Sequence, residues 1–246
     1  MRRLASCALI FAPFFSIQSH AEVRCIEPAL LAHSTIGITR YFDDAERKAQ
    51  SNLIGIQGTG WFQSPTSVVT VEHVVAAMGL STQTWKILAI QDGDDSKPIS
   101  VRIQRVIGTG WEKLVVLELE NPISAARSVS MRMYPLTPED RLVTFAYPNR
   151  ELRSVSGRFV QYATEGRLAG AALLEMSDGN NRLAIDHGAS GAPVFDCEGR
   201  VAAVISTVIT QILRTPFGEK RVSTAWGTPN VVSVPIRELL NISESQ

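Results

Sequence analysis

The stretch of the chain that says most about its fold reads Gly188-Ala189-Ser190-Gly191-Ala192-Pro193-Val194-Phe195-Asp196. A serine that attacks a carbonyl carbon must stand on a tight turn, where backbone N–H groups converge on the oxygen that gains negative charge. The small residues on both sides of Ser190 permit such a turn. The same pattern also suits an ordinary turn into a strand, so this segment alone leaves both interpretations open.

A second informative segment, residues 67–75, is a run of β-branched residues that leads into His73. Histidine is a common general base, although a single histidine after a strand is more often structural. Gly58-Thr59-Gly60 opens the hairpin that would carry it, and Ser190 follows His73 by 117 residues. Together these features favour a catalytic pair, with Ser190 as nucleophile and His73 as general base.

The composition favours a single β-rich domain. The chain has 246 residues, is 45% hydrophobic, and has 17 Gly and 12 Pro between short apolar runs. Alternation of apolar and polar residues predicts two groups of strands, one before and one after a polar stretch at residues 121–140. The predicted strands are residues 59–63, 67–71, 85–90, 99–106 and 114–119, then 142–147, 157–162, 173–176, 193–195 and 200–207. Proline at position 235, followed by apolar residues at helical spacing, predicts a short closing helix over residues 234–240.

The first 21 residues have the pattern of a secretory signal peptide. A basic start, Arg2-Arg3, precedes a mostly apolar stretch from Leu4 to Ile17, and Ala21 offers a small residue for cleavage. A membrane anchor is the weaker alternative, because the apolar stretch is shorter than the ~20 residues that span a bilayer. We therefore expect a periplasmic or secreted domain of residues 22–246.

The chain has no excess of basic residues that would attract it to nucleic acid. The chain has 24 basic and 24 acidic residues, and loss of Arg2 and Arg3 with the signal leaves 22 basic residues. No cofactor or metal is expected, and no membrane contact after signal cleavage. The partner that we expect is a protein or peptide substrate.

Two cysteines remain once the signal peptide has taken Cys7 with it. These are Cys25 and Cys197, in a compartment that permits oxidation. A disulfide between them is favoured, and two separate buried thiols are the alternative.

The motifs resemble those of the chymotrypsin-like, trypsin-type serine peptidases, in particular the bacterial HtrA-like branch. The similarity spans about residues 50–242 and includes the order of His73 before Ser190. Three further segments add to it: Phe145-Ala146-Tyr147-Pro148, residues 199–206 and Val234-Pro235-Ile236. The resemblance implies an all-β fold of two six-stranded antiparallel barrels with a short C-terminal helix, here without a PDZ domain.

The resemblance also implies roles for particular residues. His73 would take the proton of Ser190 and return it to the leaving group, while the backbone amides of Gly188 and Ser190 would form the oxyanion hole. The primary specificity pocket would be formed by Ala184, Ser206 and Thr207. Because none of these three is acidic, a small or apolar side chain is expected before the scissile bond.

The third catalytic residue of the family, an aspartate, aligns with Lys113, immediately before the strand at residues 114–119. A lysine there would oppose formation of the imidazolium, and loss of the aspartate costs ~10⁴ in rate. Glu112 could substitute, but only if the strand began irregularly, because consecutive strand residues point to opposite faces. A Ser-Lys pair that uses Lys113 is disfavoured, because this position lies behind the histidine.

Two classes of function therefore follow from the sequence. The first is an exported serine endopeptidase, which the pair of Ser190 and His73 favours. The second is a catalytically impaired member of the same fold that binds peptides or a partner protein, which Lys113 favours.

Overall fold

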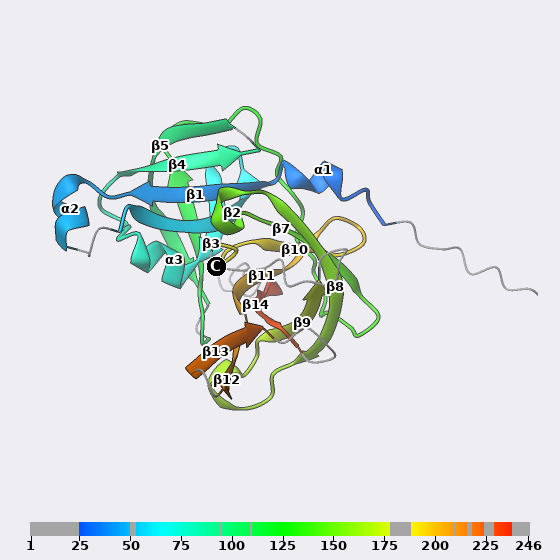
Figure 1. Cartoon of the computed structure of the whole chain (residues 1–246). Coiled ribbons are helices and arrows are strands. Elements are labelled where there is room, and N and C mark those ends of the chain that lie inside the picture. Colours follow the sequence, from blue (N-terminus) through cyan, green and yellow to red (C-terminus); the bar gives the residue numbers. More distant parts are fainter. Residues whose placement is uncertain are drawn as a thin grey trace, which may run out of the picture.

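The computed structural model describes residues 25–49, 53–93, 95–108, 110–177, 188–208, 210–215, 218–223 and 229–237. Figure 1 shows two barrels side by side, the first in blue to green and the second in yellow-green to red. Each is a closed antiparallel sheet of six strands, so the predicted double barrel is confirmed.

The first barrel is built from the N-terminal half of the described chain. Around the barrel the strands are β1 (Thr35–Tyr41), β2 (Gly55–Ser64), β3 (Ser67–Val71), β6 (Leu114–Leu119), β5 (Asp95–Ile107) and β4 (Lys86–Asp92). The helices of this half are α1 (Ala29–Ala32), α2 (Asp44–Ala49) and α3 (Glu72–Ala77).

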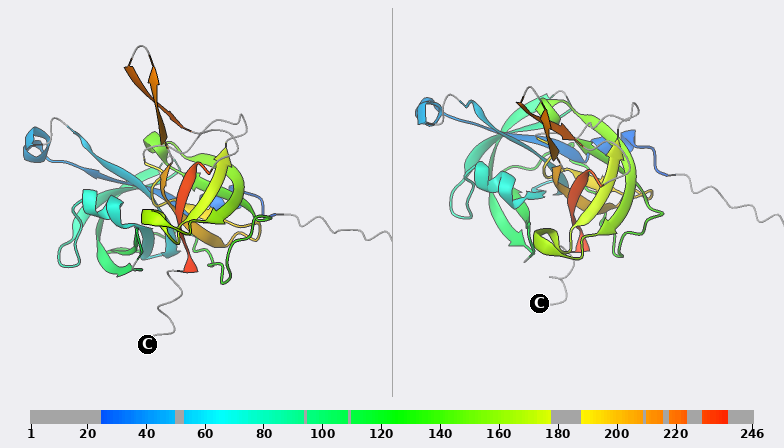
Figure 2. Two further views of the ribbon diagram at one scale, coloured as in Figure 1. Left: turned by 90° about the horizontal axis from the view of Figure 1, so that it is seen from below. Right: turned by 60° about the horizontal axis from the view of Figure 1, so that its bottom comes forward.

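The second barrel is built from the C-terminal half. Its strands, in order around the barrel, are β10 (Pro193–Phe195), β11 (Val201–Val208), β14 (Val231–Pro235), β9 (Ala172–Ser177), β8 (Arg153–Tyr162) and β7 (Arg141–Ala146). A separate hairpin of β12 (Thr210–Thr215) and β13 (Gly218–Ser223) projects from this half, as the left view of Figure 2 shows. Two short 3₁₀ turns, η1 (Pro148–Arg150) and η2 (Gly166–Leu168), connect strands at the barrel ends.

Two barrel strands, β1 and β14, were not predicted because they lack simple alternation. Strand β1 is buried along most of its length on both faces, and β14 along all of it, so neither shows the period-2 pattern of a half-buried strand. Val234 and Pro235, expected to open a helix, end β14 instead. The rest of the predicted closing helix, from position 238, lies outside the described residues.

Apolar side chains fill the space inside and between the barrels. The larger buried cluster contains Trp61 and Phe62 of β2 and extends to Phe145 and Phe195 of the second barrel. The two barrels therefore share a continuous core at their contact. None of the helices in the described part of the chain has the length and apolar content needed to cross a membrane.

A disulfide ties the start of the described chain to the second barrel. Cys25 is bonded to Cys197, and the backbone N–H of Ile26 donates to the carbonyl of Cys197 at 2.9 Å. The predicted pairing is therefore present, and it secures the N-terminal segment beside the turn that follows β10.

Candidate active site

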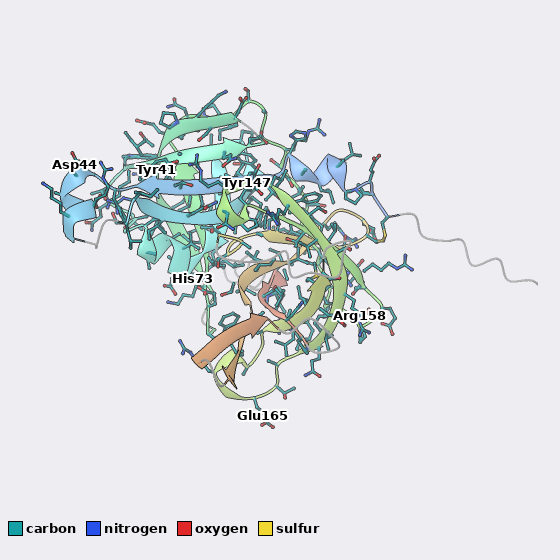
Figure 3. All side chains as sticks on the ribbon, viewed as in Figure 1. Tyr41, Asp44, His73, Tyr147, Arg158 and Glu165 are labelled. Atoms are coloured by element: carbon teal, nitrogen blue, oxygen red, sulfur yellow. A yellow bond between two sulfur atoms is a disulfide. The ribbon has the colours of Figure 1, made fainter. Side chains whose placement is uncertain are left out.

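His73 lies at the start of α3, directly after β3. The buried side chains of Val74 and Val75 attach this short helix to the first barrel, while the His73 side chain remains 46% exposed. Figure 3 labels His73 near the junction of the two barrels. The position follows from the sequence pattern, because a β-branched strand ends where the helix begins.

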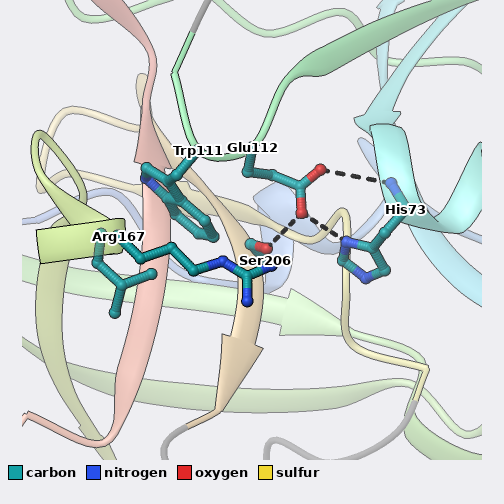
Figure 4. Close-up of a pocket in the computed structure, with 6 residues that line it drawn as sticks. His73, Trp111, Glu112, Arg167 and Ser206 are labelled. Atoms are coloured by element: carbon teal, nitrogen blue, oxygen red, sulfur yellow. Dashed lines mark hydrogen bonds and ion pairs between the residues drawn. The ribbon is translucent and has the colours of Figure 1, made fainter.

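The carboxylate of Glu112 binds the imidazole of His73. The distance from His73 Nδ1 to Glu112 Oε2 is 2.6 Å, and the backbone N–H of His73 donates to Glu112 Oε1 at 3.3 Å. The hydroxyl of Ser206 donates to Glu112 Oε2 at 2.8 Å. Figure 4 shows these three contacts, which together hold the carboxylate in one orientation.

Lys113 lies elsewhere, so the expected alignment of Lys113 with the family's acid is wrong by one residue. Its ammonium group pairs with Glu72 Oε1 at 3.0 Å, and its carbonyl accepts the Glu72 N–H at 2.9 Å. Strand β6 begins only at Leu114. Because Glu112 precedes the regular strand, the rule of alternating faces does not apply to it, and its side chain is free to turn toward His73.

The surroundings of Glu112 keep it ionised. Partial burial raises the pKa of this carboxyl group. The hydrogen bonds from His73 and Ser206 and the charge of His73 lower the pKa by more than burial raises it. The net result is a pKa below the ordinary value of 4.5. A carboxylate is therefore present next to the imidazole at neutral pH.

Ser190 stands on the turn that leads into β10, and its hydroxyl donates to the backbone carbonyl of Ser206 at 2.7 Å. The described contacts of this hydroxyl do not include the imidazole of His73. Both side chains line the same cavity, of about 500 Å³, together with Gly188, Gln57 and apolar residues of the first barrel. Rotation of the Ser190 side chain away from Ser206 is thus needed for it to reach His73.

Thr59, which is fully buried on β2, secures the loop that carries Ser190. Its backbone N–H donates to the Ser190 carbonyl at 2.8 Å, and its hydroxyl donates to the Gly188 carbonyl at 2.6 Å. The same hydroxyl accepts the N–H of Tyr147 at 3.1 Å. One residue of the first barrel therefore positions two segments of the second.

Glycines allow the Ser190 loop to lie this close to β2. Gly191 has a φ of +92°, and a Cβ there would lie 1.9 Å from the Thr59 carbonyl oxygen. Gly188 has a φ of +98°, and a Cβ there would lie 2.9 Å from the Tyr147 carbonyl oxygen. Within the described part of the chain, the amides of Gly188 and Ser190 have no hydrogen-bond acceptor, as an oxyanion hole requires.

A second cavity, of about 560 Å³, opens on the other side of His73. It is lined by His73, Trp111, Glu112, Arg167, Leu168 and Ser206. Of the three residues expected to form the specificity pocket, Ser206 lies here, with its hydroxyl turned to Glu112. Ala184 lies outside the described residues, and for Thr207 the structure describes the backbone in β11 and not the side chain.

The comparisons with known proteins agree with this geometry. Residues 58–204 match the family described as Trypsin-like peptidase domain. The chain belongs to the trypsin-like peptidase family. No curated protein matches it in a sequence comparison.

Solved structures of the same fold include several bacterial proteases. The active form of the Rv3671c protease from M. tuberculosis superposes with a TM-score of 0.58 at 15% identity, covering 98% of this chain and 91% of that one. The serine endoprotease from Yersinia pestis gives 0.55 at 14% identity and covers 90% and 63%. The HtrA-type protease AlgW with a tripeptide gives 0.56 at 14% identity and covers 87% and 60%. At these identities the likeness concerns the fold.

Three residues of this peptidase-fold site carried no signal in the sequence. Thr59 stands in the hairpin segment Gly58-Thr59-Gly60 without a role of its own, and Trp111 and Arg167 belong to none of the motifs above. Trp111 lies next to Glu112, so the corrected register would have drawn attention to it. Arg167 comes from a loop far along the chain, and only the closed second barrel brings it to the site.

Proposed function

We propose that this protein is an exported serine endopeptidase that cleaves protein or peptide substrates through Ser190, His73 and Glu112. The observation that carries the proposal is the 2.6 Å contact between Glu112 Oε2 and His73 Nδ1. This contact supplies the acid that the alignment with Lys113 left out. A Glu in this role is longer than the usual Asp by one methylene, and it reaches the ring from the segment that precedes β6.

The contact sets the direction of proton transfer. With Nδ1–H donating to Glu112, the other ring nitrogen of His73 is left to accept the Ser190 proton as its oxygen attacks the substrate carbonyl carbon. The imidazolium then gives this proton to the leaving amine as the C–N bond breaks. Water attacks the acyl-enzyme by the same route, releases the acid product and returns the proton to Ser190.

The backbone amides of Gly188 and Ser190 would stabilise the oxyanion that forms in each step. Thr59 supports this role, because it holds both the Gly188 and the Ser190 carbonyls and so fixes the orientation of the intervening peptide groups. Among the residues expected in the primary specificity pocket, none is acidic. We therefore keep a small or apolar residue before the scissile bond as part of the proposal.

The proposed location is the periplasm or the extracellular space. The Cys25–Cys197 disulfide supports it, because such bonds persist mainly in oxidising compartments. The signal-peptide pattern of residues 1–21 supports it independently, although these residues lie outside the described part of the chain.

One observation favours the second candidate, a peptide-binding protein of this fold without turnover. The Ser190 hydroxyl donates to Ser206 and not to His73, as in a site whose nucleophile is at rest. A reactive arrangement requires the Ser190 side chain to rotate away from Ser206. The two candidates therefore differ in whether Ser190 can be acylated.

A fluorophosphonate probe tests the proposal, applied to protein expressed from the whole sequence. We expect covalent labelling of one site, lost in Ser190→Ala and strongly slowed in His73→Ala and Glu112→Gln. Lys113→Met is the matched control, since its side chain faces Glu72, and it should label at the wild-type rate. Folded protein that shows no labelling would support the binding protein, as would labelling that persists in Ser190→Ala.

A further inference from the structure

Trp111, Arg167 and Leu168 line the cavity beside Glu112 and have no role in the proposed chemistry. Figure 4 shows Arg167 entering this cavity from the side opposite His73, with Trp111 and Glu112 above Ser206. Trp111 is half-buried and packs against the main apolar cluster, and Leu168 is also half-buried. The cavity therefore combines an apolar wall with one cationic side chain, directly next to the catalytic pair.

A rigid loop presents Arg167. It lies in η2, between β8 and β9, where Gly166 has a φ of +72°. Two backbone hydrogen bonds close the base of the loop, from the Ala163 N–H to the Ala171 carbonyl and from the Gly170 N–H to the Ala163 carbonyl, each at 2.8 Å. These bonds fix the backbone of the loop, and the exposed Arg167 side chain extends from it into the cavity.

The charge of Arg167 is not neutralised by a described side chain. Other arginines of this barrel have carboxylate partners, for example Arg158 with Glu175 and Arg153 with Glu151. Within the part of the chain whose side chains are described, Arg167 has none, and the nearby Glu165 makes no ion pair with it. Glu112, in the same cavity, already has both oxygens bound by His73 and Ser206.

We propose that Arg167 determines specificity: it selects peptide substrates that carry an Asp or Glu side chain close to the scissile bond and binds that carboxylate in the cavity lined by Trp111. The inference rests on the proposed peptidase function. A guanidinium binds a carboxylate through two parallel N–H···O bonds. The indole limits access of water from one side, and this strengthens the ion pair relative to one on an open surface.

Pairs of acetylated, C-terminally amidated peptides test the inference. Each pair differs only in Glu against Gln at one of the four positions on either side of the bond that mass spectrometry shows to be cut. The wild type is expected to cleave the Glu peptide with a kcat/KM about 10-fold higher at one position. Arg167→Gln should remove this preference, and Arg167→Glu should reverse it, so that the Gln peptide is cleaved faster than the Glu peptide.

Arg158→Gln is the matched control, since Arg158 is a paired surface arginine on β8 that does not line the cavity. It should leave the preference intact. The same peptide pairs are also measured for binding to the Ser190→Ala variant by fluorescence anisotropy. This readout does not depend on turnover, so it separates failure of the inference from failure of the peptidase proposal, which the fluorophosphonate probe reports.

Two results would overturn the inference. The first is equal use and equal binding of the Glu and Gln peptides at every position in folded wild-type protein. The second is a preference that depends on Arg167 but requires a free C-terminal carboxylate, shown by peptides without the amide. In that case the cavity would recognise a chain end rather than an acidic side chain.

Discussion

Glu112 is the residue whose position most affects the interpretation of this site. Its side chain is 9% exposed, and three hydrogen-bond donors contact its two oxygens. These donors stabilise the ionised form more than the protonated one, which is why the pKa of Glu112 is lowered despite burial. The carboxylate therefore contributes to stability as well as to the proposed chemistry.

The lowered pKa predicts a pH-dependent stability difference between wild type and Glu112→Gln. A carboxyl group with a depressed pKa in the folded state stabilises that state above its unfolded pKa, and the effect is lost as pH falls through the folded value. The advantage of the wild type should thus be full at pH 6 and shrink below about pH 4.5. Denaturant unfolding of both proteins between pH 6 and pH 3 measures it. A difference that is constant or grows toward pH 3 would contradict this assignment.

The structure also explains why the sequence misplaced the acid. The family alignment placed the acid immediately before the strand, at Lys113, and the alternation of faces within a strand was the argument against Glu112. Glu112 belongs to the segment before the strand, where the backbone is not restricted to two faces. Lys113 is turned away from His73 by its contact with Glu72 of α3. This contact cannot be predicted from residue spacing.

Among the elements, the contact between β2 and the Ser190 loop is expected to affect both stability and turnover. Thr59→Val keeps the shape of the buried side chain but removes the hydroxyl that joins Gly188 and Tyr147. We expect a loss of roughly 1–3 kcal/mol in the free energy of unfolding, because a buried carbonyl and a buried N–H lose their partner. A looser oxyanion loop should also lower kcat more than it changes KM.

Thr59→Ser is the matched control, because it retains the hydroxyl and loses only a methyl group. It should recover most of the stability and of the kcat. Equal defects in the Val and Ser variants would show that Thr59 matters through packing and not through its hydrogen bonds. Denaturant unfolding and steady-state kinetics on one peptide substrate give both readouts.

Most of the β elements were predictable from alternation and turn residues, and the exceptions are informative. The barrel strands that were missed, β1 and β14, are buried almost throughout, and such strands lack the polar face that alternation requires. The hairpin of β12 and β13 was missed as well. Cross-barrel contacts such as those of Thr59 with Tyr147 and Gly188 join residues 88 and 129 positions apart in sequence. They depend on how the two barrels meet, which local patterns do not encode.

At the scale of the whole molecule, the Cys25–Cys197 disulfide closes a loop with a sequence separation of 172 residues. Chain-entropy arguments give such a cross-link up to about 5 kcal/mol, and measured values are often smaller. The double variant Cys25→Ser with Cys197→Ser should therefore unfold at a clearly lower denaturant concentration than the oxidised wild type. Reduced wild-type protein is the control and should behave like the double variant.

The bond also lies near the Ser190 loop in sequence, since Cys197 follows β10 directly. Buried contacts to Thr59 hold that loop independently of the disulfide. We therefore expect the reduced protein to keep fluorophosphonate labelling under conditions where it is still folded. Loss of labelling on reduction without loss of structure would show that the disulfide positions the active site.

A kinetic comparison of Glu112 and Lys113 variants tests whether Glu112 is the acid that orients His73. With one peptide substrate at neutral pH, kcat/KM is measured for the wild type, Glu112→Gln and Lys113→Met, each shown to be folded. We expect a loss of ~10³ to 10⁴ for Glu112→Gln, because the imidazole loses its orienting carboxylate, and a change of less than a few fold for Lys113→Met. Wild-type activity in Glu112→Gln, together with a large change in Lys113→Met, would contradict it.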